Sequence, residues 1–180
     1  GVIERLIALS NRPNFVALRG NHDEWMLRAR HSREWFHSWL QKGVGGMATL
    51  ESYGAHSFGD IPPSHWNFLE STQLFYETDH FLFAHAGLEG DLPLEDQSEQ
   101  TLMWLRVTET APHFSGKTFI CGHTSQKNGV PLDLGHAICI DTFAHGGGWL
   151  SALDCDSRQL FQTNQSGETR SLWLDELEGN

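Results

Sequence analysis

Residues 16–23 read VALRGNHD, an apolar run that opens directly into arginine, glycine, asparagine, histidine and aspartate. The apolar residues from Phe15 to Leu18, followed at once by polar residues and a glycine, predict a short buried strand that ends in a loop. A loop at a strand end often carries chemistry, because the strand holds it rigid while solvent still reaches it. Residues 19–23 therefore form either an ordinary turn or part of a functional site.

Two later stretches repeat this context. Residues 81–87 read FLFAHAG and residues 118–124 read TFICGHT, so each apolar run again delivers a histidine beside a glycine. Strands of one sheet that end at the same edge would bring these imidazoles together. Imidazole nitrogens and amide oxygens are ligands for divalent metals such as Zn, Mn or Fe. A single such histidine would more simply be a core or surface residue, but the repetition favours a site.

The ordered series GNHD (20–23), HAG (85–87), GHT (122–124) and IDT (140–142) resembles that of the calcineurin-like metallophosphoesterases. Within them it is most similar to bacterial serine/threonine protein phosphatases. The likeness extends from the first residue to about residue 156. It implies an α/β fold, a four-layer α/β/β/α sandwich flanked by helices, with two metal ions at the strand ends.

The resemblance also implies roles for individual side chains. Asn21, His85 and His123 match three ligands of the second metal ion of the family site. His22 matches the imidazole that acts as general acid and protonates the departing alkoxide. An imidazole that is not bound to metal titrates near neutral pH, which suits it to this task.

Two arginines match residues that hold the phosphate in the family. A planar guanidinium binds two phosphate oxygens at once, and Arg19 and Arg106 occupy the matching positions. Each also has a simpler interpretation. Arg19 fits a surface cation, and Arg106 fits the C-terminal charge of a helix expected over about 98–106, where the helix dipole favours a cation.

The two motifs that open the family series, Asp-x-His and Gly-Asp-x-x-Asp-Arg-Gly, do not occur in the sequence. The resemblance assigns to them the ligands of the first metal ion and the carboxylate that bridges both ions. The sequence therefore predicts a chain cut just downstream of these motifs, with a sandwich that lacks its first strands. We expect at most one bound divalent ion (Mn, Fe or Zn) and impaired activity of the chain alone.

The pattern of apolar residues predicts helices early in the chain and short strands late. Helices are expected over 2–9, 23–30, 33–41, 64–70 and about 98–106, and strands over 73–77, 80–84, 117–121, 137–140, 149–154 and 159–162. There is no repeat or linker, so we expect one metallophosphoesterase domain over 1–165. A weakly specified tail, 166–180, comes after it.

Composition narrows the functional classes. The formal net charge of −11 argues against a general grip on nucleic acid or on an anionic membrane. No apolar run is long enough to span a membrane, and no secretory signal is visible. Cys121, Cys139 and Cys155 are odd in number and scattered, which predicts free thiols in a reducing, cytoplasmic compartment.

The leading functional prediction is hydrolysis of phosphoserine and phosphothreonine esters, with a phosphoprotein or a small phosphoester as substrate. A symmetrical dinucleoside-tetraphosphate hydrolase shares the motif series and is the enzymatic alternative. A non-catalytic metal-binding or phosphoprotein-binding module is the alternative from another class. Likeness at the level of the fold does not choose among these substrates.

Overall fold

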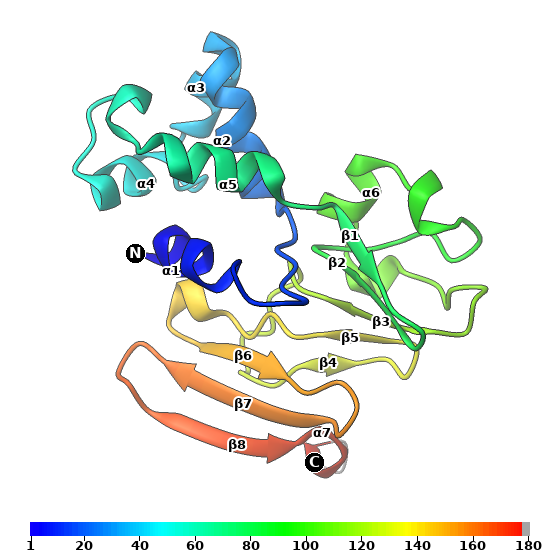
Figure 1. Ribbon diagram of the computed structural model, residues 1–180. Helices are drawn as coiled ribbons and strands as arrows, with labels where there is room; N and C mark the ends of the chain where they lie inside the picture. Colours follow the sequence, from blue (N-terminus) through cyan, green and yellow to red (C-terminus); the bar gives the residue numbers. More distant parts are fainter. Residues whose placement is uncertain (178–180) are drawn as a thin grey trace. The chain divides into compact units, whose positions relative to one another are not determined.

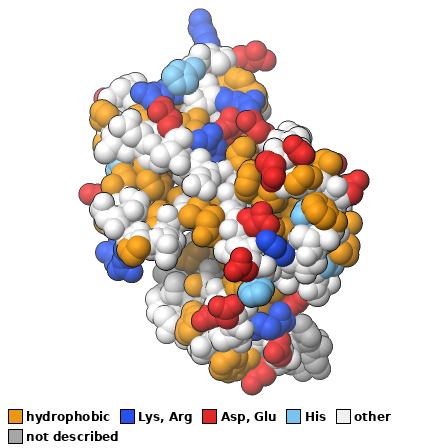
Figure 2. Space-filling model, turned by 45° about the vertical axis from the view of Figure 1, so that its right-hand side comes forward, with side chains coloured by type: hydrophobic (Ala, Val, Ile, Leu, Met, Phe, Trp, Pro, Cys, Tyr) orange, Lys and Arg blue, Asp and Glu red, His pale blue; other side chains and the backbone are white. Residues whose placement is uncertain are grey.

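The computed structural model describes residues 1–177, so the end of the predicted tail, 178–180, lies outside the described residues. The chain divides into two compact units, one from Gly1 to Tyr76 and one from Glu77 onward (Figure 1). Within residues 1–177, no helix combines the length and the apolar character needed to cross a membrane. Acidic, basic and apolar side chains are interspersed on the face drawn in Figure 2.

The first unit is built from helices. They are α1 (Val2–Leu9), α2 (Asn21–His31), α3 (Arg33–Trp39), α4 (Gly46–Tyr53), the 3-10 helix η1 (Phe58–Asp60) and α5 (Pro63–Ser71). Pro63 occupies the first helical position of α5, where its missing N–H leaves no hydrogen bond unmade. The predicted helices of this half are thus present.

Aromatic side chains dominate the core of the first unit. Trp39 and Trp66 are each only 2% exposed, and the ring of Phe58 lies 5.2 Å from the first and 5.3 Å from the second. Met26 and Leu27 of α2 belong to the same cluster. Aromatic pairs stabilise a core by about 0.5–1.5 kcal/mol beyond the area they bury. This packing fixes α2 within its unit.

The prediction of a buried strand at Phe15–Leu18 is wrong. The segment is extended but only partly buried, and an isolated bridge joins Leu18 to Gln73. The Arg19 N–H donates to the Gln73 carbonyl (2.7 Å), and the Gln73 N–H donates to the Ala17 carbonyl (2.9 Å). An apolar run marks a segment that can be buried, but a regular strand needs a partner along its whole length.

The main sheet of the second unit has the strand order β1-β2-β3-β5-β4. Its strands are β1 (Phe75–Glu77, where the two units meet in the sequence), β2 (Phe81–Ala84), β3 (Thr118–Cys121), β4 (Leu132–Asp133) and β5 (Ala137–Cys139). Strand β3 runs parallel to both β2 and β5, with Phe83 opposite Ile120 and Cys121 opposite Cys139. Parallel strands end at the same edge, which is where open α/β sheets bind ligands.

A second, antiparallel sheet has the strand order β6-β7-β8. Its strands are β6 (Trp149–Leu153), β7 (Gln159–Asn164) and β8 (Thr169–Trp173), and the short helix α7 (Leu174–Leu177) comes after them. The remaining elements are η2 (Leu94–Asp96), α6 (Glu99–Trp104), η3 (Val107–Glu109) and η4 (Ala144–Gly146). The sequence predicted neither β4 nor β8.

An apolar layer joins the two sheets. Ile120 of β3, Ile138 of β5 and Leu160 of β7 are at most 5% exposed and form one cluster. Because side chains alternate along a strand, the opposite face of the main sheet carries a second set, in which Leu82 is 0% and Phe119 1% exposed. The main sheet is therefore buried on both faces, and the fold is mixed α/β as predicted.

Candidate functional site

The parallel pairing of β2 and β3 brings His85 and His123 together at one edge of the main sheet. His85 directly follows β2, and its carbonyl accepts a hydrogen bond of 2.9 Å from the Gly122 N–H. This bond ties the two strand-end loops to each other. The topology thus places these two histidines as the strand pattern suggests.

The two imidazoles face each other across a short distance. His85 Nε2 and His123 Nδ1 are 3.2 Å apart, with ring centroids separated by 5.1 Å and planes inclined at 63°. The Trp104 ring lies near edge-on to His123, at 6.1 Å and 78°. Both histidines are partly buried. Two ring nitrogens are therefore held close together where water has limited access.

The turn that carries His123 is strained. Its φ of 61° lies in the left-handed region, which residues other than glycine rarely adopt. The Thr124 N–H donates to the Gly122 carbonyl (2.6 Å) across the histidine and closes a three-residue turn, here called the Gly122 turn. Such conformations store about 1–3 kcal/mol and persist where the surroundings impose them, often at functional sites. The Cys139 thiol contacts the carbonyl oxygens on either side of His123, that of Gly122 at 3.1 Å and that of Thr124 at 3.4 Å.

The separation of the two nitrogens is compatible with a shared metal ion. Two ligands of one ion, each about 2.1 Å from it, stand about 3.0–3.4 Å apart in tetrahedral or octahedral geometry. The observed 3.2 Å falls in this range, although a hydrogen bond between imidazoles has a similar length. Among residues 1–177, no group of three or more His, Cys, Asp or Glu side chains is gathered to hold a metal. A further protein ligand would have to be of another type, such as an asparagine.

Asp141, just beyond β5, belongs to the motif series of the sequence, which assigns it no role, and the structure shows what it binds. The Ser125 hydroxyl donates to one of its oxygens (2.9 Å), and the Phe143 N–H donates to the other (3.0 Å). The Gln126 N–H donates to its main-chain carbonyl (2.7 Å). The residue thereby anchors the loop that follows His123. Its place at the end of a strand parallel to β3 is the signal that could have identified it.

Asn21 and His22 occupy the first turn of α2 in the first unit. Gly20 precedes the helix with extended backbone (φ −94°, ψ 167°), and its N–H donates to the Asp23 carboxylate at 2.9 Å. We call this segment, Gly20–Asp23, the Gly20 turn. Asp23 thus caps the helix through its side chain, and no return bond from the N-cap side chain exists, because residue 20 is a glycine. Burial raises the pKa of the Asp23 carboxyl, and the Gly20 N–H partly offsets that rise.

His22 presents an exposed ring with one anchored nitrogen. Its Nδ1 lies 3.0 Å from the Val44 carbonyl, and the Trp25 ring packs edge-on to it at 5.8 Å. Because a carbonyl can only accept, Nδ1 carries a proton and Nε2 is the nitrogen that gains or loses one. Asn21 is 3% exposed. Metal binding by Asn21 and proton transfer by His22 stay predictions.

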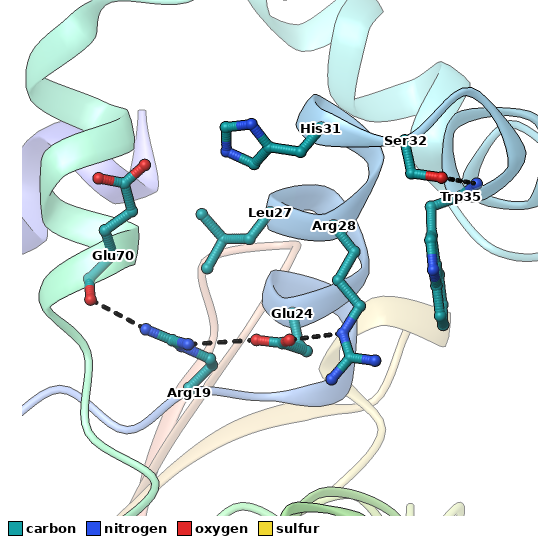
Figure 3. A pocket seen from close by; sticks show the side chains of 8 residues that line it. All are labelled: Arg19, Glu24, Leu27, Arg28, His31, Ser32, Trp35 and Glu70. Atoms are coloured by element: carbon teal, nitrogen blue, oxygen red, sulfur yellow. Dashed lines mark hydrogen bonds and ion pairs between the residues drawn. The ribbon is translucent and has the colours of Figure 1, made fainter.

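Arg19 is held by groups of its own unit (Figure 3). Figure 3 shows its bonds to Glu24 (from Nη1, 3.1 Å) and to the Glu70 carbonyl (from Nη2, 2.9 Å). Its Nε also donates to the Thr72 hydroxyl (3.1 Å), and its Nη2 to the Leu69 carbonyl (3.3 Å). These carbonyls end α5, where a cation is favoured. The pocket drawn in Figure 3, about 580 Å³, lies beside this guanidinium. Phosphate binding by Arg19 stays a prediction, and it would require the guanidinium to share these partners.

Arg106 is exposed and lies at the start of η3. Helix α6 ends at Trp104, because the Leu102 carbonyl accepts from the Ala86 N–H (2.8 Å) instead of from the next turn. The interpretation of Arg106 as a charge in the last turn of this helix is therefore wrong. In the described part of the chain its guanidinium has no ion pair or hydrogen bond, so it is available to a ligand.

Two thiols lie behind the histidine edge. Cys121 and Cys139 are register neighbours on β3 and β5 and are 4% and 0% exposed. The hydrogen bond with Cys139, together with burial, raises the pKa of Cys121, which keeps that thiol protonated at neutral pH. These two cysteines and Cys155 are free, as the sequence predicted.

Comparisons with known proteins agree with the fold. No family model matches the chain, and no curated protein matches it. Among solved structures, one described as a "putative diadenosine tetraphosphatase" is similar, with a TM-score of 0.60 and 19% sequence identity. The match covers 96% of this chain and 72% of that chain. At this identity the likeness concerns the fold alone, and this chain shares its mixed α/β fold with that structure.

Proposed function

We propose that the chain is a metal-dependent phosphoesterase. The observation that carries the proposal is the pair of ring nitrogens, His85 Nε2 and His123 Nδ1, held 3.2 Å apart beyond the C-terminal ends of the parallel strands β2 and β3. The motif series of the sequence and the description of the matched structure support the same reaction class.

In this proposal His85 and His123 would hold a divalent ion, Mn, Fe or Zn, through their ring nitrogens. The motif series adds Asn21 as a third ligand, and this part of the proposal rests on the sequence alone. When bound, such an ion supplies Lewis-acid activation of water and of the phosphoryl group. The bond from the Gly122 N–H to the His85 carbonyl keeps the two imidazoles in register before any ion binds.

The other predicted residues act on the proton and on the phosphate. His22 gives the proton on Nε2 to the departing oxygen, while the contact of Nδ1 with the Val44 carbonyl keeps the ring oriented. Arg106, whose guanidinium has no partner among residues 1–177, would bind phosphate oxygens. Arg19 joins it as the second phosphate-binding arginine only if it shares the hydrogen bonds that now cap α5.

Two classes of substrate are compatible with the proposed reaction. A phosphoserine or phosphothreonine ester is the leading candidate, from the likeness of the motif series to protein phosphatases. A dinucleoside tetraphosphate is the second candidate, and the description of the matched structure favours it.

The test is to measure metal binding and hydrolysis in the same preparations. The wild-type chain, loaded with Mn²⁺ or Zn²⁺, is given a phosphopeptide, a dinucleoside tetraphosphate and an aryl phosphate. We expect His123→Ala to lose both metal binding and turnover. The matched control is His80→Asn, which removes an exposed imidazole just before β2, at the opposite end of the strand from His85.

The outcomes separate the candidate functions. The preferred natural substrate of the wild-type chain decides between the two esterase activities. Metal binding that is lost in His123→Ala, with no turnover of any substrate by the wild type, would identify a non-catalytic metal-binding module. Equal metal affinity in His123→Ala and His80→Asn would contradict the metal site.

A further inference from the structure

A hollow of about 390 Å³ lies in the first unit, where α2 ends and α3 begins. Its polar lining consists of Arg30, His31, Ser32, Arg33, His56 and Ser57. In the described part of the chain no carboxylate lines it. All six of these side chains can donate hydrogen bonds.

The basic character of this hollow runs against the composition of the chain. The sequence has 12 Lys and Arg residues against 23 Asp and Glu residues, so cations are scarce. Two arginines, Arg30 and Arg33, nevertheless share this lining with two imidazoles. A surface patch with the average composition of this chain would carry a net negative charge.

Local helix chemistry explains only part of the cluster. Arg30 and His31 stand in the last turn of α2, where the helix dipole favours a cation. Arg33 is the first residue of α3, where the dipole disfavours one. His56 lies outside any helix. A ligand that carries negative charge would account for the positions of Arg33 and His56 together.

The acidic residues near the hollow do not cancel all of the positive charge of its lining. Glu70 pairs with Arg30 at 2.8 Å from outside the lining, and the guanidinium of Arg30 lies 4.7 Å from the ring centroid of Trp66. Arg33 is exposed and forms no ion pair within residues 1–177. The positive charge of Arg33 is therefore not neutralised by any carboxylate of the described residues.

Asp60 also lies near, but its carboxylate is occupied by the backbone. One of its oxygens accepts from the N–H groups of His56 (3.0 Å) and Ser57 (2.9 Å) and from the Ser57 hydroxyl (3.2 Å). These bonds lower the pKa of Asp60, so it stays ionised, and they fix the loop that carries His56. The wall of the hollow that this loop forms is therefore fixed before any ligand binds.

We propose that this hollow binds a phosphate group. Two guanidinium forks, two imidazole N–H groups and the Ser32 hydroxyl provide the directional donors that phosphate oxygens accept, and Arg33 provides an unpaired charge. The hollow is separate from His22, because the helix from His22 to His31 spans about 14 Å. It does not depend on the proposed function.

The neighbouring pocket, drawn in Figure 3, also contains two arginines, but a carboxylate neutralises their charge. It shares His31 and Ser32 with the hollow, but Glu24 lies between its two arginines. The carboxylate of Glu24 is 3.1 Å from Arg19 and 2.6 Å from Arg28. Those guanidinium groups are already paired, so we assign the phosphate to the hollow that lacks a carboxylate.

The test is a titration of the chelator-treated full chain with inorganic phosphate, followed through the ring NMR signals of His31 and His56. Chloride at matched ionic strength is the reference. We expect a saturable shift of both rings with phosphate and none with chloride. Arg33→Ser should weaken phosphate binding about fivefold or more, and Arg33→Lys should have an intermediate effect because it keeps the charge but loses the fork.

The matched control is Arg12→Ser, which removes another exposed arginine of the same unit that lies outside the hollow. Both arginines are on the surface, so each variant is expected to fold, and melting curves verify it. Unsaturable shifts, an unchanged affinity in Arg33→Ser, or an equal loss in Arg12→Ser would each overturn the proposal. Phosphate binding here in a chain that hydrolyses no substrate would support this site and reject the proposed function.

Discussion

The Gly20 turn and the Gly122 turn place a histidine next to a glycine in opposite ways. In the Gly20 turn the backbone enters a helix, and Asp23 caps it from three residues away. In the Gly122 turn the backbone folds back at once, with φ of 61° at the histidine. His22 is consequently exposed, whereas His123 meets a second imidazole.

The difference shows that one local sequence signal leads to two structures. The residues after each histidine decide the outcome: an acidic cap and helix formers come after His22, while Thr124 and Ser125 come after His123. The helical turn is relaxed and leaves its imidazole open to solvent. The strained turn fixes its imidazole against a partner, as expected where the partner matters for function.

The largest expected difference concerns the segments that lead into the two turns. Phe119 of β3 is 1% exposed, so Phe119→Ala should lower the free energy of unfolding by about 3–5 kcal/mol. Leu18 is partly buried and has one isolated bridge, so Leu18→Ala should lower it by only about 1–2 kcal/mol. Urea unfolding measures both. Equal losses would mean that the Gly20 turn rests on packing as dense as that of the Gly122 turn.

The next effect is on catalysis and rests on the proposed function. In active enzyme, His22→Asn should reduce turnover of a phosphoserine peptide about 100-fold but that of nitrophenyl phosphate less than about 10-fold, because only the alkoxide needs a proton. His123→Asn should reduce both rates alike. The measurement is kcat on the two substrates. A loss of the same size on both in His22→Asn would remove the general acid from the mechanism.

A smaller effect tests the backbone of each turn directly. At position 123 glycine tolerates the left-handed conformation, so His123→Gly should be more stable than His123→Ala by about 1 kcal/mol. At position 22, inside a helix, the order should reverse, with His22→Gly less stable than His22→Ala by about 0.5–1 kcal/mol. Unfolding of metal-free protein compares the four variants. The same order at both positions would show that the turns do not differ as described.

The smallest effect concerns the cap of the Gly20 turn. Asp23→Ala removes the acceptor of the Gly20 N–H and should lower the free energy of unfolding by about 0.5–1 kcal/mol. Asp23→Asn keeps an acceptor and should have less effect.

The two Asp23 variants also differ from wild type in their pH dependence. The folded state raises the Asp23 pKa above 3.8, so its contribution is greatest below that pH and falls as pH rises through the raised pKa. Asp23→Asn, which cannot ionise, should abolish this fall. Unfolding of chelator-treated protein over a pH series measures it, and a wild-type curve parallel to that of Asp23→Asn would contradict the shift.

The part of the fold that the sequence predicts well is the centre of the main sheet. Phe81–Ala84 and Thr118–Cys121 are short apolar runs bounded by turn-forming residues, and both are strands. Their parallel pairing agrees with the helix that lies between them in the sequence, and it brings the two histidines to one edge. Local composition and one rule of topology suffice there.

Strand β8 could not be predicted in the same way, because its stability comes from pairing with β7. Its sequence, three polar residues followed by Leu172 and Trp173, does not alternate polar and apolar residues, although exposed and partly buried positions alternate along the strand, with Arg170 among the partly buried ones. That arginine packs 4.1 Å from the Trp149 ring centroid and donates to the Gln162 side chain at 2.6 Å. A sequence pattern cannot show that a partly buried arginine has found such partners.

The arginines of the candidate site show the same limit. The role of Arg19 as a cap for α5 depends on carbonyls at least 50 residues away in the sequence. The freedom of Arg106 depends on where α6 ends, which a contact with the Ala86 N–H determines. Residue type identified both as phosphate-binding candidates, but only tertiary contacts reveal what each guanidinium already binds.

The buried thiol pair gives the molecule a natural reporter of its own motions. Cys121 and Cys139 are hidden from solvent, whereas Cys155 is partly exposed. A thiol reagent in excess will therefore modify Cys155 first and reach the other two only when β3 and β5 separate. The rate of that slow phase equals the frequency with which the histidine edge opens, at high reagent concentration. A single time course of thiol modification thus distinguishes transient opening of this edge from fluctuations elsewhere in the protein. It needs no substrate and no introduced probe.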